Sequence, residues 1–234
     1  MSSENSEPGV VHPVRKIQPS FAGWYFEHRY SVLFLSLMVT LILSPVTQEY
    51  RLPSWPVELL YLMNLAAAAT GLDSSRLRKW ALVIVTLTAA FRMLGRVLNV
   101  EAASELATTL FIGLAALAAV TSLRFAFQGR RADRERLCAA LSTYLLAGHM
   151  FGVCYWQVGQ LRTGTFATGG APMVAGALDL PTCVYFSFVT LATLGYGDIS
   201  PLTPTARGLA VAEAIIGQLY LAVLVARLVG SKWE

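Results

Sequence analysis

The sequence predicts an all-α polytopic membrane protein with six transmembrane helices and a short re-entrant helix between the fifth and the sixth. Three observations support this fold class. Hydrophobic residues make up 55% of the 234 residues, and the mean hydropathy is +0.55. Charged residues make up 14%, whereas an average soluble domain has about 25%. These charges lie in short clusters between apolar runs, as a bilayer requires.

Six apolar runs come near the length of about 20 residues that crosses the hydrocarbon of a membrane. Pro45 is expected to help end the first run. Glu58 and Asn64 make the second run the weakest of the six. The predicted spans cover, in order, residues 30–46, 55–72, 80–100, 104–127, 136–159 and 204–230.

The basic residues predict how the spans are oriented. If the N-terminus is cytosolic, 13 of the 18 basic residues fall on the inner side and three on the outer side. The other two, Arg92 and Arg96, lie within the third span. Because cytoplasmic loops carry an excess of Lys and Arg, we expect both termini to be cytosolic. The predicted location is the cell membrane, plasma or inner, in contact with lipids.

The segment between the last two spans has a different character. Residues 159–179 are rich in Gly, Ala and Thr and are expected to form a loop on the outer side. The apolar run of residues 181–193 is too short to span and predicts a re-entrant or buried helix. Pro181 suits the first turn of such a helix.

The sequence TLGYGD, residues 193–198, follows this short helix directly. Selecting an ion inside a membrane requires groups that replace its water shell, and backbone carbonyls can do so when four strands direct them at one axis. Alternating signs of φ expose such carbonyls, and Gly195 and Gly197 permit positive φ at little steric cost. The carbonyls of Thr193, Leu194, Gly195 and Tyr196 would make successive ion sites. The alternative is an ordinary glycine-rich turn after a buried helix.

A short helix that ends in T-x-x-T-[VL]-G-Y-G-D between two spans resembles the pore module of potassium channels. Here residues 190–198 read TLATLGYGD, and the resemblance covers about residues 136–230. It implies a potassium-selective channel subunit that conducts K+ passively, with residues 193–197 as the selectivity filter. Leu194 replaces the commoner Val, which is conservative because only its carbonyl faces the ion.

The resemblance also names residues that support the filter. Asp198 is expected behind the outer mouth, where it hydrogen-bonds to its neighbours. Tyr185 and Phe186 stand where many members have two Trp residues, and they imply an aromatic cuff. Val189 occupies a position that is Glu in some members, so a carboxyl pair with Asp198 is not possible. The side chain of Tyr196 is expected to point away from the pore and to pack on the short helix.

Several glycines and one histidine lie inside predicted spans. Gly217 falls where this family often has a hinge in its pore-lining helix, and close packing on a neighbour explains a glycine there equally well. Gly148 and Gly152 form a small-xxx-small pair, which indicates helix packing. His149 is more often a core histidine than a proton sensor.

The layout of six spans with the pore last resembles that of voltage-gated channels. Residues 1–29 are then a cytosolic tail and interfacial segment, 30–127 a four-helix voltage-sensor-like domain, 128–135 a cytosolic linker and 136–234 the pore domain. Arg124 is the only basic residue of the fourth span, which therefore lacks a regular series of arginines, and steep voltage gating is not expected. Four residues follow Gly230, and from this we expect no ligand-binding domain after the last span.

Charged residues inside the third and fourth spans predict ion pairs. Arg92 and Arg96 lie one helical turn apart, and Glu101 and Glu105 near the outer end are their candidate partners. An intramembrane Arg suggests function, although a structural pair is at least as good an explanation. Glu58 and Glu213 remain open cases.

The sequence also limits the partners and the chemistry. One filter segment without an internal repeat implies four chains per pore, a homotetramer. K+ is the expected transported ion, with no cofactor and no nucleic-acid partner. No nucleophile–base set, metal cluster or phosphate loop is visible, so an enzyme is not expected. The alternatives are a less selective cation channel and a non-conducting scaffold or regulatory subunit.

Overall fold

The computed structural model describes residues 21–51, 55–72, 74–98, 101–128 and 133–230. The predicted tail of residues 1–20 lies outside these ranges. The described elements are, in chain order, α1 (Phe21–Glu27), α2 (Arg29–Glu49), α3 (Trp55–Thr70), α4 (Ser75–Leu98), α5 (Glu101–Phe127), α6 (Arg134–Leu161), β1 (Phe166–Thr168), β2 (Ala171–Pro172), α7 (Leu180–Leu191), β3 (Ile199–Pro201) and α8 (Pro204–Gly230).

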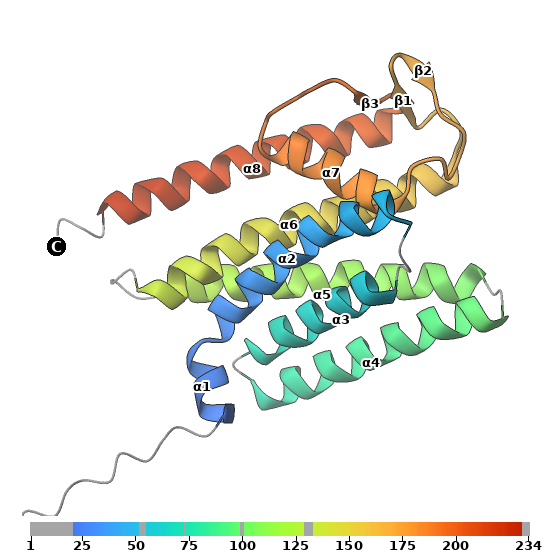
Figure 1. Ribbon diagram of the computed structural model, residues 1–234. Helices are drawn as coiled ribbons and strands as arrows, with labels where there is room; N and C mark the ends of the chain where they lie inside the picture. Colours follow the sequence, from blue (N-terminus) through green and yellow to red (C-terminus); the bar gives the residue numbers. More distant parts are fainter. Residues whose placement is uncertain (1–20, 52–54, 73, 99–100, 129–132, 231–234) are drawn as a thin grey trace, which may run out of the picture.

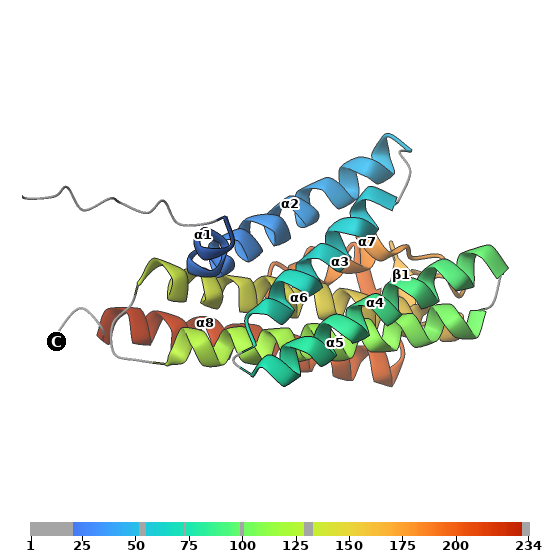
Figure 2. The same cartoon turned by 90° about the horizontal axis from the view of Figure 1, so that it is seen from below.

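The long helices run roughly side by side and alternate in direction (Figures 1 and 2). α2 begins at one end of this bundle. The helices α3, α5 and α8 end there (Figure 1). The three strands lie at the opposite end (Figure 1). An up-and-down order of this kind is what a chain that crosses a layer repeatedly must adopt.

Four of the described helices are long and apolar enough to cross a membrane: Arg29–Glu49, Glu105–Phe127, Arg134–Leu161 and Pro204–Gly230. α3 has 16 residues and α4 includes five basic residues, so neither belongs to this set. The structure therefore supports an all-helical membrane protein with four candidate spans. The prediction of six spans would require α3 and α4 to cross the membrane as well.

Some predicted boundaries were wrong. Pro45 does not end the first span, because α2 continues to Glu49. A proline inside a helix removes one hydrogen bond, and a membrane helix tolerates this where neighbouring groups satisfy the freed carbonyl. The helix predicted as the third span, α4, begins at Ser75 rather than at residue 80, because the polar turn before the apolar run is helical as well. α6 begins at Arg134, inside the predicted linker, after the side chain of Asp133 accepts from the Arg136 amide.

The expected loop of residues 159–179 contains two short strands, so this part of the prediction needs a correction. β1 pairs antiparallel with β2 and with β3 in a three-stranded sheet of order β2-β1-β3. The Gly169–Gly170 turn, with positive φ at both residues, joins the first two strands. These strands have two or three residues each, too short for an alternating pattern to be visible in the sequence.

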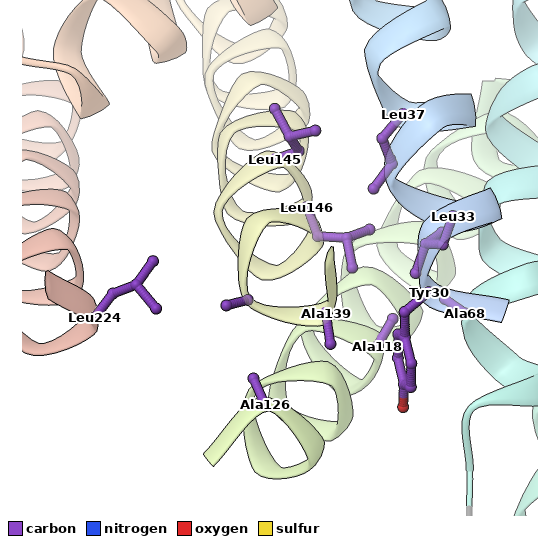
Figure 3. Packing of buried hydrophobic residues seen from close by; sticks show 11 residues of the cluster. Tyr30, Leu33, Leu37, Ala68, Ala118, Ala126, Ala139, Leu145, Leu146 and Leu224 are labelled. Atoms are coloured by element: carbon purple, nitrogen blue, oxygen red, sulfur yellow. The ribbon is translucent and has the colours of Figure 1, made fainter. Parts of the chain in front are cut away.

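Apolar side chains join the helices of residues 29–127 to α6 of the same chain. Leu33 and Leu37 of α2 point toward α6, where Leu145 and Leu146 belong to the same buried cluster (Figure 3). Ala118 of α5 joins them.

Polar contacts hold α2 at both of its ends. The carboxylate of Glu135 accepts the backbone amide of Tyr30 at 3.0 Å and the hydroxyl of Ser31. A carboxylate at this position also suits the positive end of the helix dipole. At the other end, the amide of Gln48 donates to Asp179, just before α7. α2 is thereby fixed against its own α6 and α7.

Candidate selectivity filter

The short helix α7 begins and ends with defined caps. The side chain of Asp179 accepts from the amide of Thr182 at 2.9 Å, and Pro181 lies in the first turn. At the other end, Thr193 N donates to Thr190 O at 3.0 Å and Leu194 N donates to Val189 O at 2.8 Å. These two bonds form a Schellman motif. The helix therefore stops where the sequence TLGYGD begins.

Residues 193–197 have the alternating backbone that the sequence predicts for Gly195 and Gly197. Their φ values are +59° and +76°, and Thr193 also has a positive φ, of +57°. A positive φ is a genuine outlier for a β-branched residue. Strained backbone of this kind tends to occur at functional sites. Thr193 occupies the C′ position of the Schellman motif, which is usually Gly.

The segment lies open on the surface of a single chain. Residues 193–198 are all exposed, with Leu194 at 56% and Tyr196 at 66% of full exposure. The predicted packing of Tyr196 on the short helix is therefore not made extensively within one chain. Immediately after the segment, Ile199 is buried as the first residue of β3. Pairing of Thr168 with Ile199 anchors this end of the segment to β1.

Two consecutive residues of α8 support the start of the segment. The side-chain amide of Gln218 donates to the hydroxyl of Thr193 at 3.1 Å. A Cβ added at Gly217 would lie 2.4 Å from the carbonyl oxygen of Leu191. Close packing thus accounts for this glycine, and a hinge at Gly217 stays a prediction. The sequence did not indicate Gln218.

The predicted supporting residues lie in different places. The hydroxyl of Tyr185 donates to the Asp198 carboxylate at 2.9 Å, so these two residues meet. Phe186 turns away and packs edge-on against Tyr155 and Phe166, with ring centroids 4.8 and 5.7 Å apart. Val189 is buried, and its carbonyl oxygen accepts from Leu194.

The glycine pair of α6 provides the surface on which α7 lies. A Cβ at Gly148 would lie 2.5 Å from the ring of Phe188, and one at Gly152 would lie 2.7 Å from the Cα of Val184. Both contacts agree with the predicted helix packing. Between the two glycines, His149 lies against Tyr61 and Phe188, and its Nδ1 is 2.8 Å from the carbonyl oxygen of Leu145.

Glu213 of α8 is fully buried at the junction of three helices. Its Oε2 accepts the hydroxyl of Tyr155 from α6 at 2.5 Å, and its Oε1 contacts the hydroxyl of Ser187 from α7. The same Ser187 hydroxyl lies 2.7 Å from the carbonyl oxygen of Gly148. The sequence left the role of Glu213 open, because an isolated carboxyl in a span does not reveal which neighbours it meets.

The predicted ion pairs of the third and fourth spans stay predictions. The side chains of Arg96 and Glu101 lie outside the described residues. Arg92 is partly buried on α4 and interacts electrostatically with Tyr61 of α3. Glu105 is exposed on α5. The three cysteines, Cys138, Cys154 and Cys183, are free thiols.

Comparison with known proteins points to one class of protein. Residues 140–231 match a family model described as an ion channel. Two pore potassium channel c of rice, Oryza sativa subsp. japonica, is 35% identical over 88 residues. The match covers 37% of this chain and 17% of that relative.

The matched region contains α7, the TLGYGD segment and α8, and it is similar to an ion-channel domain. These similarities to an ion-channel family and to a potassium channel support the resemblance that the sequence predicts. Such a domain also argues for a channel rather than an enzyme.

Proposed function

We propose that this chain is one subunit of a potassium-selective channel that conducts K+ passively through a homotetrameric pore. The observation that carries the proposal is the backbone of residues 193–197, with positive φ at every second residue. Such alternation turns successive carbonyl oxygens toward one side. Four copies around an axis would then replace the water shell of K+. Thr193, Leu194, Gly195 and Tyr196 would supply the carbonyls, and Gly197 would close the segment.

The small sheet supports a re-entrant path for α7. The chain leaves this sheet at β2 and returns to it at β3, both beside β1. Between the two strands, α7 extends as far as the middle of α8, where Gly217 meets Leu191. Residues 173–198 therefore enter the layer of long helices and come back to the same side. Non-helical backbone at this depth requires cover from protein and access to water.

The exposed surface of the single chain supports a tetramer. Leu194 and Tyr196 are exposed, and so is much of α8. The exposed apolar side chains of α8 include Val211, Ile215, Ile216, Leu219, Val223, Val225 and Val229. Lipid can cover the apolar side chains of α8. It cannot hydrogen-bond to the exposed backbone N–H and C=O groups of residues 193–198. Neighbouring copies would cover that backbone, and one segment per chain leads to four chains per pore.

The end of α7 supports selection of a cation. A helix carries partial negative charge at its carboxyl end. The last turn of α7 contains no basic residue that would neutralise this charge. In the tetramer, four such ends would meet near Thr193 and favour a positive ion below the filter.

We infer that α3 and α4 complete a four-helix domain with α2 and α5, which gives six spans in total. Both ends of the chain then face the cytosol, in agreement with the basic residues, and lipid surrounds the outer helices. α5 contains a single basic residue, Arg124, so this fourth helix lacks the series of charges that a voltage sensor needs.

Reconstitution into a planar bilayer tests the proposal. With K+ on one side and Na+ on the other, a selective channel reverses near the K+ equilibrium potential. A reversal potential near zero would indicate a less selective cation channel instead. Absence of current at every voltage, with tetramers present by cross-linking, would favour a non-conducting subunit.

A further inference from the structure

The contacts of Glu213 require more protons than its two partner hydroxyls provide. The network has three contacts: Tyr155 hydroxyl to Oε2, Ser187 hydroxyl to Oε1, and Ser187 hydroxyl to the Gly148 carbonyl oxygen. Each hydrogen bond needs one proton, and a hydroxyl has one to donate. Tyr155 and Ser187 together supply two. If no proton is shared between two acceptors, the third proton comes from the carboxyl group.

The Gly148 carbonyl decides where the protons lie. A carbonyl oxygen only accepts, so the contact of 2.7 Å uses the proton of Ser187. The contact between Ser187 Oγ and Glu213 Oε1 then needs a donor on the glutamate side. The Tyr155 hydroxyl donates to the other carboxyl oxygen, Oε2.

The surroundings of Glu213 also favour a neutral carboxyl. The side chain is 0% exposed, and no ion pair to it occurs within the described part of the chain. The titratable groups that face it are Tyr155, Tyr144 and Cys154, all on α6. α7 contributes the uncharged Ser187. A buried carboxylate without a cation nearby is strongly disfavoured.

We propose that Glu213 is a protonated carboxylic acid and a positioning residue for the filter. Its hydroxyl donates from Oε1 to Ser187, and Ser187 in turn donates to Gly148. This chain of bonds fixes α8 and α7 against α6, and α7 leads directly into residues 193–198. Without the carboxyl proton, Ser187 turns to the carboxylate and leaves Gly148, so α7 loses one of its attachments.

Glutamine is the matched replacement, because its amide group donates to Ser187 and its carbonyl accepts from Tyr155. We therefore expect Glu213→Gln to keep all three contacts at every pH. Glu213→Leu has neither donor nor acceptor and breaks the network. Glu105→Gln makes the same chemical change at an exposed position of α5 and serves as the control.

Infrared spectroscopy of the reconstituted protein at neutral pH tests the proton directly. The C=O stretch of a protonated carboxylic acid is absent from a carboxylate. We expect this band in the wild type and in Glu105→Gln, and its loss in Glu213→Gln. An unchanged band in Glu213→Gln would overturn the proposal. Should that variant fail to fold, Tyr155→Phe removes the bond to Oε2 and should shift the band; an unshifted band would overturn it equally.

A second measurement tests the positioning role and rests on the proposed channel function. At alkaline pH the wild type should lose selectivity for K+ over Na+, whereas Glu213→Gln should keep it. Equal pH profiles of the two proteins would argue against a positioning role of the proton. If no protein conducts, the proposed function fails, and the infrared band still decides the protonation of Glu213.

Discussion

The side-chain amide of Gln218 donates a hydrogen bond of 3.1 Å to the hydroxyl of Thr193. This bond joins the middle of α8 to the first residue of the proposed filter. Thr193 has a positive φ of +57°, a strained conformation for a threonine. The neighbouring contact between Gly217 and the Leu191 carbonyl brings α8 close enough for the amide to reach.

We expect Gln218→Leu to weaken the selection of K+ over Na+. The loss of a neutral hydrogen bond costs about 1 kcal/mol, which corresponds to about fivefold in a permeability ratio. Reversal potentials under mixed K+ and Na+ measure this ratio. Ile215→Leu changes an exposed apolar residue of the same helix and should leave the ratio unchanged. Equal ratios in all three proteins would contradict a role of Gln218 at the filter.

Gly195→Ala should abolish selective conduction. Gly195 has a φ of +59°, and a side chain in this left-handed region costs roughly 1–2 kcal/mol per residue. In the proposed tetramer four substituted chains meet in one pore, so the strain occurs four times. Gly208→Ala on α8, where an added Cβ meets no atom within 4 Å, is the control and should conduct normally. Retained K+ selectivity in Gly195→Ala would refute the filter assignment.

Gly217→Ala should destabilise the protein through a clash. The added Cβ would lie 2.4 Å from the Leu191 carbonyl oxygen, a backbone atom that cannot easily move. Overpacking of this kind typically costs about 1–3 kcal/mol. Thermal unfolding in detergent measures the loss, with Gly113→Ala of α5, which meets no atom within 4 Å, as control. Equal stability of the two variants, with altered gating only in Gly217→Ala, would favour a hinge.

Tyr185→Phe removes the hydroxyl that donates to Asp198 at 2.9 Å. Hydrogen bonds to charged groups contribute about 1.5–3 kcal/mol. Without this bond the outer end of the filter should hold its shape less well, and current should decay faster when external K+ is low. Tyr50→Phe makes the same change at an exposed tyrosine and should not alter the decay. Identical decay in both variants would contradict this support role.

Conductance should depend only weakly on voltage. Arg124 is the one basic residue of α5 and lies in its last turn. Moving one elementary charge through 100 mV yields about 2.3 kcal/mol, and steep gating needs several charges per subunit. Currents recorded over a voltage range, with Arg124→Gln as comparison, test this. A steep conductance–voltage relation that Arg124→Gln abolishes would show that this single charge is a sensor.

The sequence predicted the parts of the fold that depend on hydrophobic length and on special residues. The apolar runs predicted the long helices, because a long apolar run is a strong signal in the sequence. Gly195 and Gly197 carried the prediction of positive φ, which only glycine adopts easily. Pro181 marked the first turn of α7. Family resemblance added Tyr185 and Asp198, which the structure brings together.

Other parts depend on contacts between distant residues, which no local pattern records. The strands are too short to show alternation, and β1 and β3 are far apart in the chain. Gln218 looks like an ordinary polar residue until α8 lies beside Thr193. Glu213 becomes informative only when α6 and α7 supply Tyr155 and Ser187. Pro45 predicted the end of a helix, but α2 continues past it to Glu49.

The attachment of α2 at both ends bears on how subunits combine. Its partners, Glu135 and Asp179, belong to the same chain, and so do the apolar residues of α6 beneath it. One chain alone thus supplies both attachments of α2. These attachments need no second copy, so a chain can form them before it enters the proposed tetramer.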